Sequence, residues 1–245
     1  MKTNQSQKKR AIIVSLLVTL FLTTSIIAQQ TVSASDIIND IKSGKTINYT
    51  NVTIIGDFDM TYMNEKLPDL PKKRKWYKNG GSNSVEEQIE SKISFTNCSF
   101  EDNVYAYFHD EDSGYTFIAN FENDVAFTNC TFKREALFKY SDFERSADFK
   151  GSKFNMRSTF KYAKFHENVS FAGTNFNEDA IFKYSHFKKG VSFNNAVFED
   201  NLDIKYTKIR GDFDTTNMSV SNNIDSKYTN INGKGFSKHL LNRKN

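Results

Sequence analysis

The chain has 245 residues and 38% hydrophobic residues, enough for one domain with a sizeable core. Its formal net charge is +4, but Lys2, Lys8, Lys9 and Arg10 supply four positive charges at the N-terminus, so the rest of the chain is close to neutral and gives no support to a nucleic-acid partner. The composition includes 23 Phe beside only 5 Met, 2 Cys and 2 Pro, and this excess indicates a core position that recurs along the chain.

The N-terminal residues have the order of a secretory signal. The basic segment 8–10 precedes an apolar stretch from 11 to 27, and the small residue Ala28 follows. We therefore expect residues 1–28 to be a signal peptide with cleavage after Ala28, or alternatively after Ala34. The protein is then exported to the periplasm, the cell envelope or the medium. Membrane contact is expected only if the signal stays uncleaved, because the apolar stretch is nearly long enough to span a bilayer.

A short amphipathic helix is predicted over residues 35–44. Ser33 and Ser35 are candidate N-caps, Ile37 and Ile41 lie on one apolar face, and Gly44 is a C-terminal stop. We expect this helix to cover one end of the repeat array that follows, because end coils otherwise expose apolar faces and unpaired strand edges.

The array is predicted to run from 47 to 231 with two insertions. The tetrapeptide at 56–59, Gly-Asp-Phe-Asp, recurs at 211–214, so both ends of the array belong to one domain. The first insertion covers about 64–90 and holds a basic segment, in which Arg74, Lys75 and Trp76 are candidate binding residues for an anionic envelope component. A solvated loop is the alternative reading of this segment.

Two cysteines locate the second insertion, at about 106–116. The segment 95–100 matches 127–132 at a distance of 32 residues, ten more than the regular period. Cys98 and Cys130 therefore take equivalent inward positions on neighbouring coils, about 5 Å apart. They are either a disulfide, which the distance and an oxidising compartment permit, or two buried thiols. We expect reduced thiols, and the mass of the intact protein would distinguish the two states.

One large residue, nearly always Phe, recurs from 121 to 209 in alternating steps of six and five. A small or β-branched residue stands two places before it. Side chains two apart point to the same side of a strand, so each step is predicted to be a short strand that turns both side chains inward. These spacings do not hold one face of an α-helix. The predicted core residues are Phe127, Phe132, Phe138, Phe143, Phe149, Phe154, Phe160, Phe165, Phe171, Phe176, Phe182, Phe187, Phe193 and Phe198.

A Lys-Tyr pair recurs every 22 residues, from 139–140 to 227–228, so four steps make one coil. We interpret the Tyr column first as a structural ladder and second as a strip that binds a sugar or an anionic polymer. The candidate binding residues are Tyr140, Tyr162, Tyr184 and Tyr206. At the other five-residue corner the same place holds Asn129, Gly151, Gly173 or Asn195, which tolerate positive φ, so the Tyr corners are expected to use a different geometry.

This pattern resembles the pentapeptide-repeat family, in its Phe-centred variant with alternating five- and six-residue steps, as in residues 146–154. The resemblance implies an all-β right-handed quadrilateral β-helix, with short capping helices expected at both ends. Residues 232–245 are the predicted C-terminal cap, in which Phe236, Leu240 and Leu241 could form an apolar face.

The sequence predicts no enzyme and no cofactor. The four His residues are dispersed without metal-ligand spacing, and no phosphate loop, nucleophile elbow or Cys/His pair with a supporting acid is found. We expect an exported, non-enzymatic repeat scaffold that presents a rigid surface to an unknown protein or envelope component. The alternative is a polysaccharide-binding or polysaccharide-cleaving β-helix protein. The resemblance also implies a remote alternative, a DNA mimic, but export and interleaved basic residues such as Lys133 and Lys161 argue against it.

Overall fold

The computed structural model describes residues 30–71 and 83–237. The predicted signal peptide, the candidate residues Arg74, Lys75 and Trp76, and Leu240 and Leu241 of the predicted C-terminal cap lie outside the described residues. Within the described ranges, no helix has the length and apolar character needed to span a membrane.

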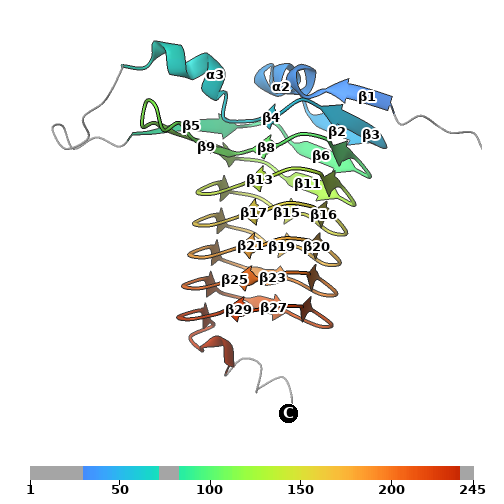
Figure 1. Ribbon diagram of the computed structural model, residues 1–245, viewed down its shortest axis with the longest axis vertical. Coiled ribbons are helices and arrows are strands. Elements are labelled where there is room, and N and C mark those ends of the chain that lie inside the picture. Colours follow the sequence, from blue (N-terminus) through green and yellow to red (C-terminus); the bar gives the residue numbers. More distant parts are fainter. Residues whose placement is uncertain (1–29, 72–82, 238–245) are drawn as a thin grey trace, which may run out of the picture.

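Four short strands make one coil of a solenoid. In one complete coil they are β15 (Ala147–Asp148), β16 (Lys153–Phe154), β17 (Ser158–Thr159) and β18 (Lys164–Phe165), and β19 (Val169–Ser170) begins the next coil beside β15. Each strand pairs in parallel with the strand 22 residues later, so the stacked coils form four parallel sheets (Figure 1). The predicted right-handed quadrilateral β-helix is confirmed.

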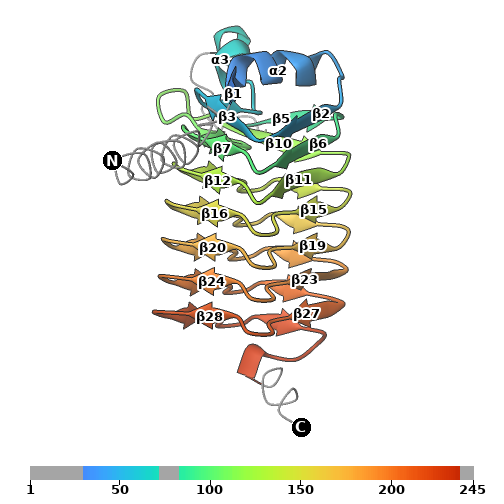
Figure 2. The same ribbon diagram turned by 90° about the vertical axis from the view of Figure 1, so that its right-hand side faces the viewer.

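We name the four sheets A to D, and Figure 2 shows sheets A and B as straight columns. Sheet A contains β1 (Gln30–Ser33), β3 (Val52–Ile55), β7 (Ser99–Phe100), β12 (Thr131–Phe132), β16, β20 (Asn175–Phe176), β24 (Val197–Phe198) and β28 (Ser219–Val220). Sheet B contains β2 (Ile47–Thr50), β6 (Ile93–Thr96), β11 (Val125–Thr128), β15, β19, β23 (Gly190–Ser192) and β27 (Asp212–Asp214). Sheet C contains β4 (Phe58–Asp59), β8 (Val104–Tyr105), β13 (Ala136–Leu137), β17, β21 (Ala180–Ile181), β25 (Leu202–Asp203) and β29 (Ile224–Asp225). Sheet D contains β5 (Ser84–Ile89), β9 (Tyr107–His109), β10 (Thr116–Phe121), β14 (Asp142–Phe143), β18, β22 (His186–Phe187), β26 (Lys208–Ile209) and β30 (Asn230–Ile231).

The core consists of Phe columns, one behind each sheet. Every predicted core Phe is at most 1% exposed. The ring of Phe160, for example, stacks on Phe138 at 5.1 Å and on Phe182 at 5.0 Å between centroids, with interplanar angles of 2° and 5°. Rings from different sheets meet edge to face, as Phe149 and Phe160 do at 76°. Both arrangements are favourable for aromatic rings, so the core is ordered along the axis and across it.

Hydroxyl groups occupy many of the small inward positions. The side chain of Thr174 donates to the Phe149 carbonyl at 2.9 Å, and Ser185 donates to the Phe160 carbonyl at 2.7 Å. These bonds join one coil to the next and pair carbonyl oxygens that are buried. A small side chain with a donor therefore suits the position better than its size alone suggests.

The prediction that the Tyr corners use a different backbone geometry is wrong. Tyr140, Tyr162, Tyr184, Tyr206 and Tyr228 have φ between 59° and 66°, the same left-handed region as Gly151 and Gly173 at 66°. A non-glycine residue in this region costs about 1–2 kcal/mol relative to right-handed backbone. Interactions of the side chain must therefore offset that cost at each Tyr corner.

The N-terminal end of the solenoid is covered by a helix, as Figure 1 shows. Helix α2 (Ala34–Lys42) begins after Ser33, whose hydroxyl accepts from the Ser35 backbone N–H, and it buries Ile37 and Ile41. At the other end of the described chain, Phe236 is buried and its ring lies 6.4 Å from that of Phe213. The two helices of the described residues, α2 and α3 (Met63–Lys66), are both short.

The first insertion is shorter than the sequence predicts. After α3 and the 3₁₀ turn η1 (Leu67–Asp69), the chain returns at β5, which pairs with β10 over six residues of sheet D. Only Ile89 of β5 is buried, so this strand lacks the Phe that marks the others. In the second insertion, β9 pairs antiparallel with β10 and extends sheet D sideways.

We predict that Phe160→Ala lowers the free energy of unfolding by about 3–5 kcal/mol, because it removes a fully buried ring that stacks on two others. Urea unfolding followed by circular dichroism measures the change. Lys153→Ala, an exposed position on sheet A, is the control and should change stability by less than about 0.5 kcal/mol. A loss below about 1 kcal/mol for Phe160→Ala would contradict this account of the core.

Candidate functional site: the Tyr ladder and the sheet D face

The structure brings the candidate Tyr residues together at the corner between sheets C and D. Tyr140, Tyr162, Tyr184, Tyr206 and Tyr228 stack with centroid distances of 4.7 to 4.9 Å and interplanar angles of 3° to 22°. We call this column the Tyr ladder. Each ring face inside it is covered by the next ring, so the ladder presents ring edges and hydroxyl groups to solvent. Stacking of this kind contributes about 0.5–1.5 kcal/mol per pair, which offsets the backbone cost of the left-handed corner.

The paired lysines also interact with the ladder. Their ammonium groups lie between 4.9 Å (Lys139 over Tyr140) and 5.9 Å (Lys205 over Tyr206) from the ring centroids. This is the range of a cation–π contact. Partial burial, together with the neighbouring charges of Lys139 and Lys183, lowers the pKa of Lys161. The lysines thus form a closely spaced row of like charges.

Two further tyrosines extend the ladder toward the N-terminus, and the sequence interpretation missed both. The ring of Tyr107 lies 5.9 Å from that of Tyr140, and its hydroxyl accepts from Lys139 at 2.9 Å. Tyr62 has φ of 55° at the same corner of the first coil. Burial raises the pKa of Tyr62, and the ammonium group of Lys42 lies 4.7 Å from its ring centroid. The signal was Phe58 four places earlier, as Ala136 stands four places before Tyr140.

A groove of about 470 Å³ runs between the Tyr ladder and the outer face of sheet D. Its floor alternates in charge along the solenoid. The residues that line the groove in consecutive coils are Tyr140, Asp142, Tyr162, Lys164, Tyr184 and His186.

Outward side chains on sheet D form two columns, one on each side of the buried central residue. The pairing of Phe121, Phe143, Phe165, Phe187 and Ile209 holds both columns in register. The first column contains Gln88, Asn120, Asp142, Lys164, His186, Lys208 and Asn230. The second contains Glu90, Glu122, Glu144, His166, Lys188, Arg210 and Asn232.

Charge on this face changes sign along the solenoid. We call Glu90, Glu122, Asp142 and Glu144 the acidic half, and Lys164, Lys188, Lys208 and Arg210 the basic half. All but Asp142 are exposed. Sheet A has no such order, since its equivalent column contains Glu101, Lys133, Asn155, Asn177, Glu199 and Ser221.

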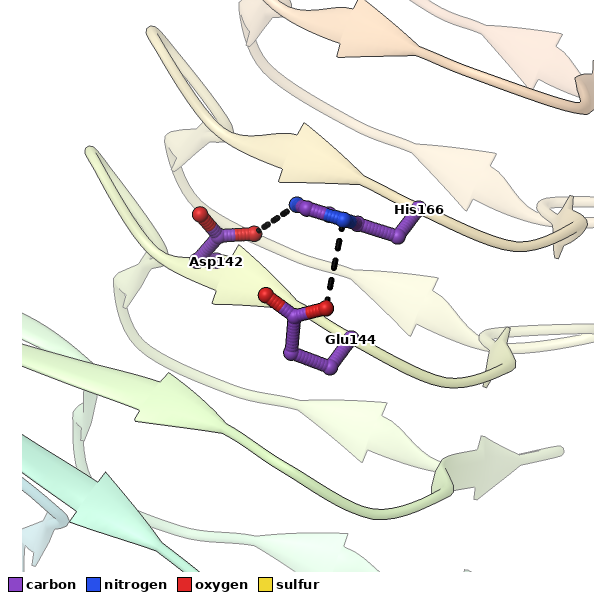
Figure 3. A group of neighbouring side chains, drawn as sticks. All are labelled: Asp142, Glu144 and His166. Carbon is purple, nitrogen blue, oxygen red and sulfur yellow. Dashed lines mark ion pairs between the residues drawn. The ribbon is translucent and has the colours of Figure 1, made fainter.

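His166 lies at the point where the charge changes sign, between two carboxylates (Figure 3). Its Nε2 is 2.6 Å from Asp142 Oδ1 and its Nδ1 is 3.2 Å from Glu144 Oε2. A His and two carboxylates within 4.8 Å of one another could hold a metal ion. Here the ammonium groups of Lys164 and Lys188 already contact Asp142 Oδ2 at 3.1 Å and His166 Nδ1 at 3.0 Å. Two cations at the same ligand groups disfavour a third, so we interpret the cluster as a junction of ion pairs.

The sequence interpretation missed this cluster. It considered spacing along the chain only, whereas the 22-residue period places residue 166 directly beside residue 144. The same count would have found both columns.

His186 reports the field of the basic half. Burial lowers its pKa from the ordinary value, and the charges of Lys208, Lys164, Lys188 and Arg210 lower it further. The basic half is therefore a region of positive potential to which anionic groups are attracted.

The cysteines lie on neighbouring coils, because Ser99 pairs with Thr131. Both are buried free thiols in this structure. The Cys130 thiol donates to the Phe95 carbonyl at 3.4 Å, and its contact with Cys98 together with burial raises the pKa of Cys130. Their redox state after export stays a prediction.

Comparison with known proteins identifies the repeats. The family model described as "Pentapeptide repeats (9 copies)" matches residues 119–163 and 160–208. No curated protein and no solved structure matches the chain.

We predict that Tyr162→Ala destabilises the protein by about 1–3 kcal/mol, because two stacked pairs are lost. Tyr162→Gly should be about 1–2 kcal/mol more stable than Tyr162→Ala, since glycine adopts the left-handed corner without strain. Tyr162→Phe keeps the ring and is the control. Equal stability of the Ala and Gly variants in urea unfolding would contradict this account of the corner.

A second prediction concerns pH. The pKa of His186 is lowered in the folded state from its ordinary value of 6.5, so below that pH the unfolded chain binds the proton first and stability falls with pH. His186→Gln removes this effect. We therefore expect the variant to gain stability relative to the wild type between about pH 7.5 and about pH 5, as measured by urea unfolding.

Lys208→Gln serves as the control for His186. It removes one of the charges that lower the pKa of His186, so it should reduce the pH-dependent difference without abolishing it. A difference between wild type and His186→Gln that is the same at both pH values would contradict the assignment.

Proposed function

We propose that this chain, a pentapeptide-repeat protein, is an exported, non-enzymatic scaffold whose sheet D face is an interaction surface for a protein or a component of the cell envelope. The observation that carries the proposal is the ordered change of charge along sheet D. A rigid stack of coils holds these side chains in straight columns, so the surface is organised before any partner binds.

The groove beside the Tyr ladder supports binding over catalysis. Two of its lining residues carry carboxyl groups, and both already have partners. Glu86 Oε2 accepts from Asn120 at 3.1 Å, and Asp142 is paired with Lys164 and His166. A general acid with a raised pKa needs a carboxyl group that is desolvated and not paired with a cation.

The stacking of the Tyr ladder weakens the polysaccharide alternative. Aromatic platforms for sugars use an exposed ring face, and the inner rings of the ladder have theirs covered. Tyr228 at the end of the ladder is 62% exposed, which leaves one exposed ring and no extended strip.

Export rests on the N-terminal segment, and the structure supports the first of the two predicted cleavage positions. Strand β1 begins at Gln30 and pairs with β3, and Ser33 caps α2. Cleavage after Ala34 would remove both features. Cleavage after Ala28 would keep them.

Cell fractionation of the source organism tests the proposal. The full chain with a C-terminal epitope tag should appear outside the cytosol with its N-terminus at Gln29, and part of it should be retained by the envelope. Leu17→Arg with Leu20→Arg should keep the chain in the cytosol, because the charges interrupt the apolar stretch.

Two charge variants then test the surface. Lys188→Glu with Arg210→Glu, on sheet D, should release the exported chain from the envelope fraction. Lys133→Glu with Lys153→Glu, on sheet A, changes the net charge equally and should leave the distribution unchanged. A cytosolic chain with an intact N-terminus, or equal behaviour of the two variants, would contradict the proposal.

A further inference from the structure

We propose that two copies of this chain pair through their sheet D faces in antiparallel orientation, so that the acidic half of each copy lies against the basic half of the other. This inference rests on the proposed role of sheet D as an interaction surface and names its occupant.

The order of charges in the second column carries the inference. Rows on sheet D are one coil apart, about 4.7–4.9 Å. A two-fold axis that runs along the strands through the row of His166 reverses the order of the rows. It places Glu144 opposite Lys188 and Glu122 opposite Arg210, and each contact occurs twice because the interface is isologous.

The first column agrees with the same axis. Asp142 comes opposite His186, and Asn120 comes opposite Lys208. Lys164 and His166 meet their own copies at the axis, where Asp142 and Glu144 of both copies are close enough to balance them. No carboxylate of either column is placed opposite another carboxylate.

Charges at the ends of the columns lack opposite partners within one chain. Among the described residues, ion pairs on sheet D occur at the change of sign, where Lys164 and His166 contact Asp142 and Glu144. No ion pair is found there for Glu90, Glu122, Lys208 or Arg210, and all four are exposed. Like charges stacked one coil apart repel each other, and an antiparallel second copy replaces that repulsion with attraction.

The orientation is set by the columns and not by net charge, which is small outside the first ten residues. A parallel arrangement would put like charges together. An anionic polymer would contact only the basic half and would be repelled by Glu122 and Glu144. A second copy uses both halves, so the observations favour it.

Sedimentation velocity on the purified exported chain tests the inference. We expect a dimer at about 0.1 M salt that dissociates toward about 1 M, where the screening length falls from roughly 10 Å to roughly 3 Å. The variant Lys188→Glu with Arg210→Glu makes the face acidic throughout, and Glu122→Lys with Glu144→Lys makes it more basic. Each reverses four contacts of the dimer and should raise the dissociation constant by at least about tenfold.

Mixing these two variants is the decisive arm, because each is complementary to the other. An equimolar mixture should form a heterodimer at least as tight as the wild-type dimer, which also shows that both variants are folded. Lys133→Glu with Lys153→Glu on sheet A should dimerise like the wild type.

A wild-type monomer at low salt, or a mixture that stays monomeric while both variants keep the circular dichroism of the fold, would overturn the inference. Polyphosphate added to the wild type provides the competing outcome. If the monomer binds it, Lys188→Glu with Arg210→Glu abolishes binding and no dimer forms, then the basic half is a site for anionic polymers. Envelope retention in cells can succeed or fail independently of this result, so the proposed function and the dimer are separately testable.

Discussion

Stacking of Phe rings in register, one coil on the next, is the interaction on which the rest of this structure depends. Ring planes such as those of Phe154 and Phe176 are nearly parallel, 3° apart, at a centroid distance of 4.9 Å. That distance is close to the spacing of hydrogen-bonded strands, so the same repeat satisfies the core and the backbone. Because the core allows no drift between coils, outward residues 22 apart also line up. The Tyr ladder and the charged columns of sheet D are consequences of this registration.

Much of the fold could be predicted, because the core repeats one residue type at fixed steps. Seventeen positions from Phe121 to Ile209 specify the strands without any local propensity. Strand β5 escaped because its only buried residue is Ile89, between polar residues that read as a loop. The Tyr corners were misjudged because φ was assigned from the preference of single residues. Stacking with the next coil, which is a tertiary interaction, reverses that preference at Tyr162.

The candidate site was less predictable, because its residues differ in kind from coil to coil. The Tyr ladder repeats one residue and was visible, whereas Glu144, His166 and Lys188 share only a position. Their relation appears when the chain is written in rows of 22. Side-chain geometry was needed for the rest, since the ion pairs of His166 and the covered ring faces of the ladder both bear on what the surface can bind. A scaffold that binds by charge order is the function that these features support together.

Pulsed electron spin resonance tests the central claim, that one coil of constant height takes 22 residues. Spin labels on the outer face of sheet A at Thr53 and at one of Lys153, Val197 or Ser219 would be three, five or six coils apart. With a strand spacing of about 4.8 Å, the account predicts label distances near 14, 24 and 29 Å, rising by about 5 Å for each coil. Distances that do not grow in proportion to the number of coils would contradict it.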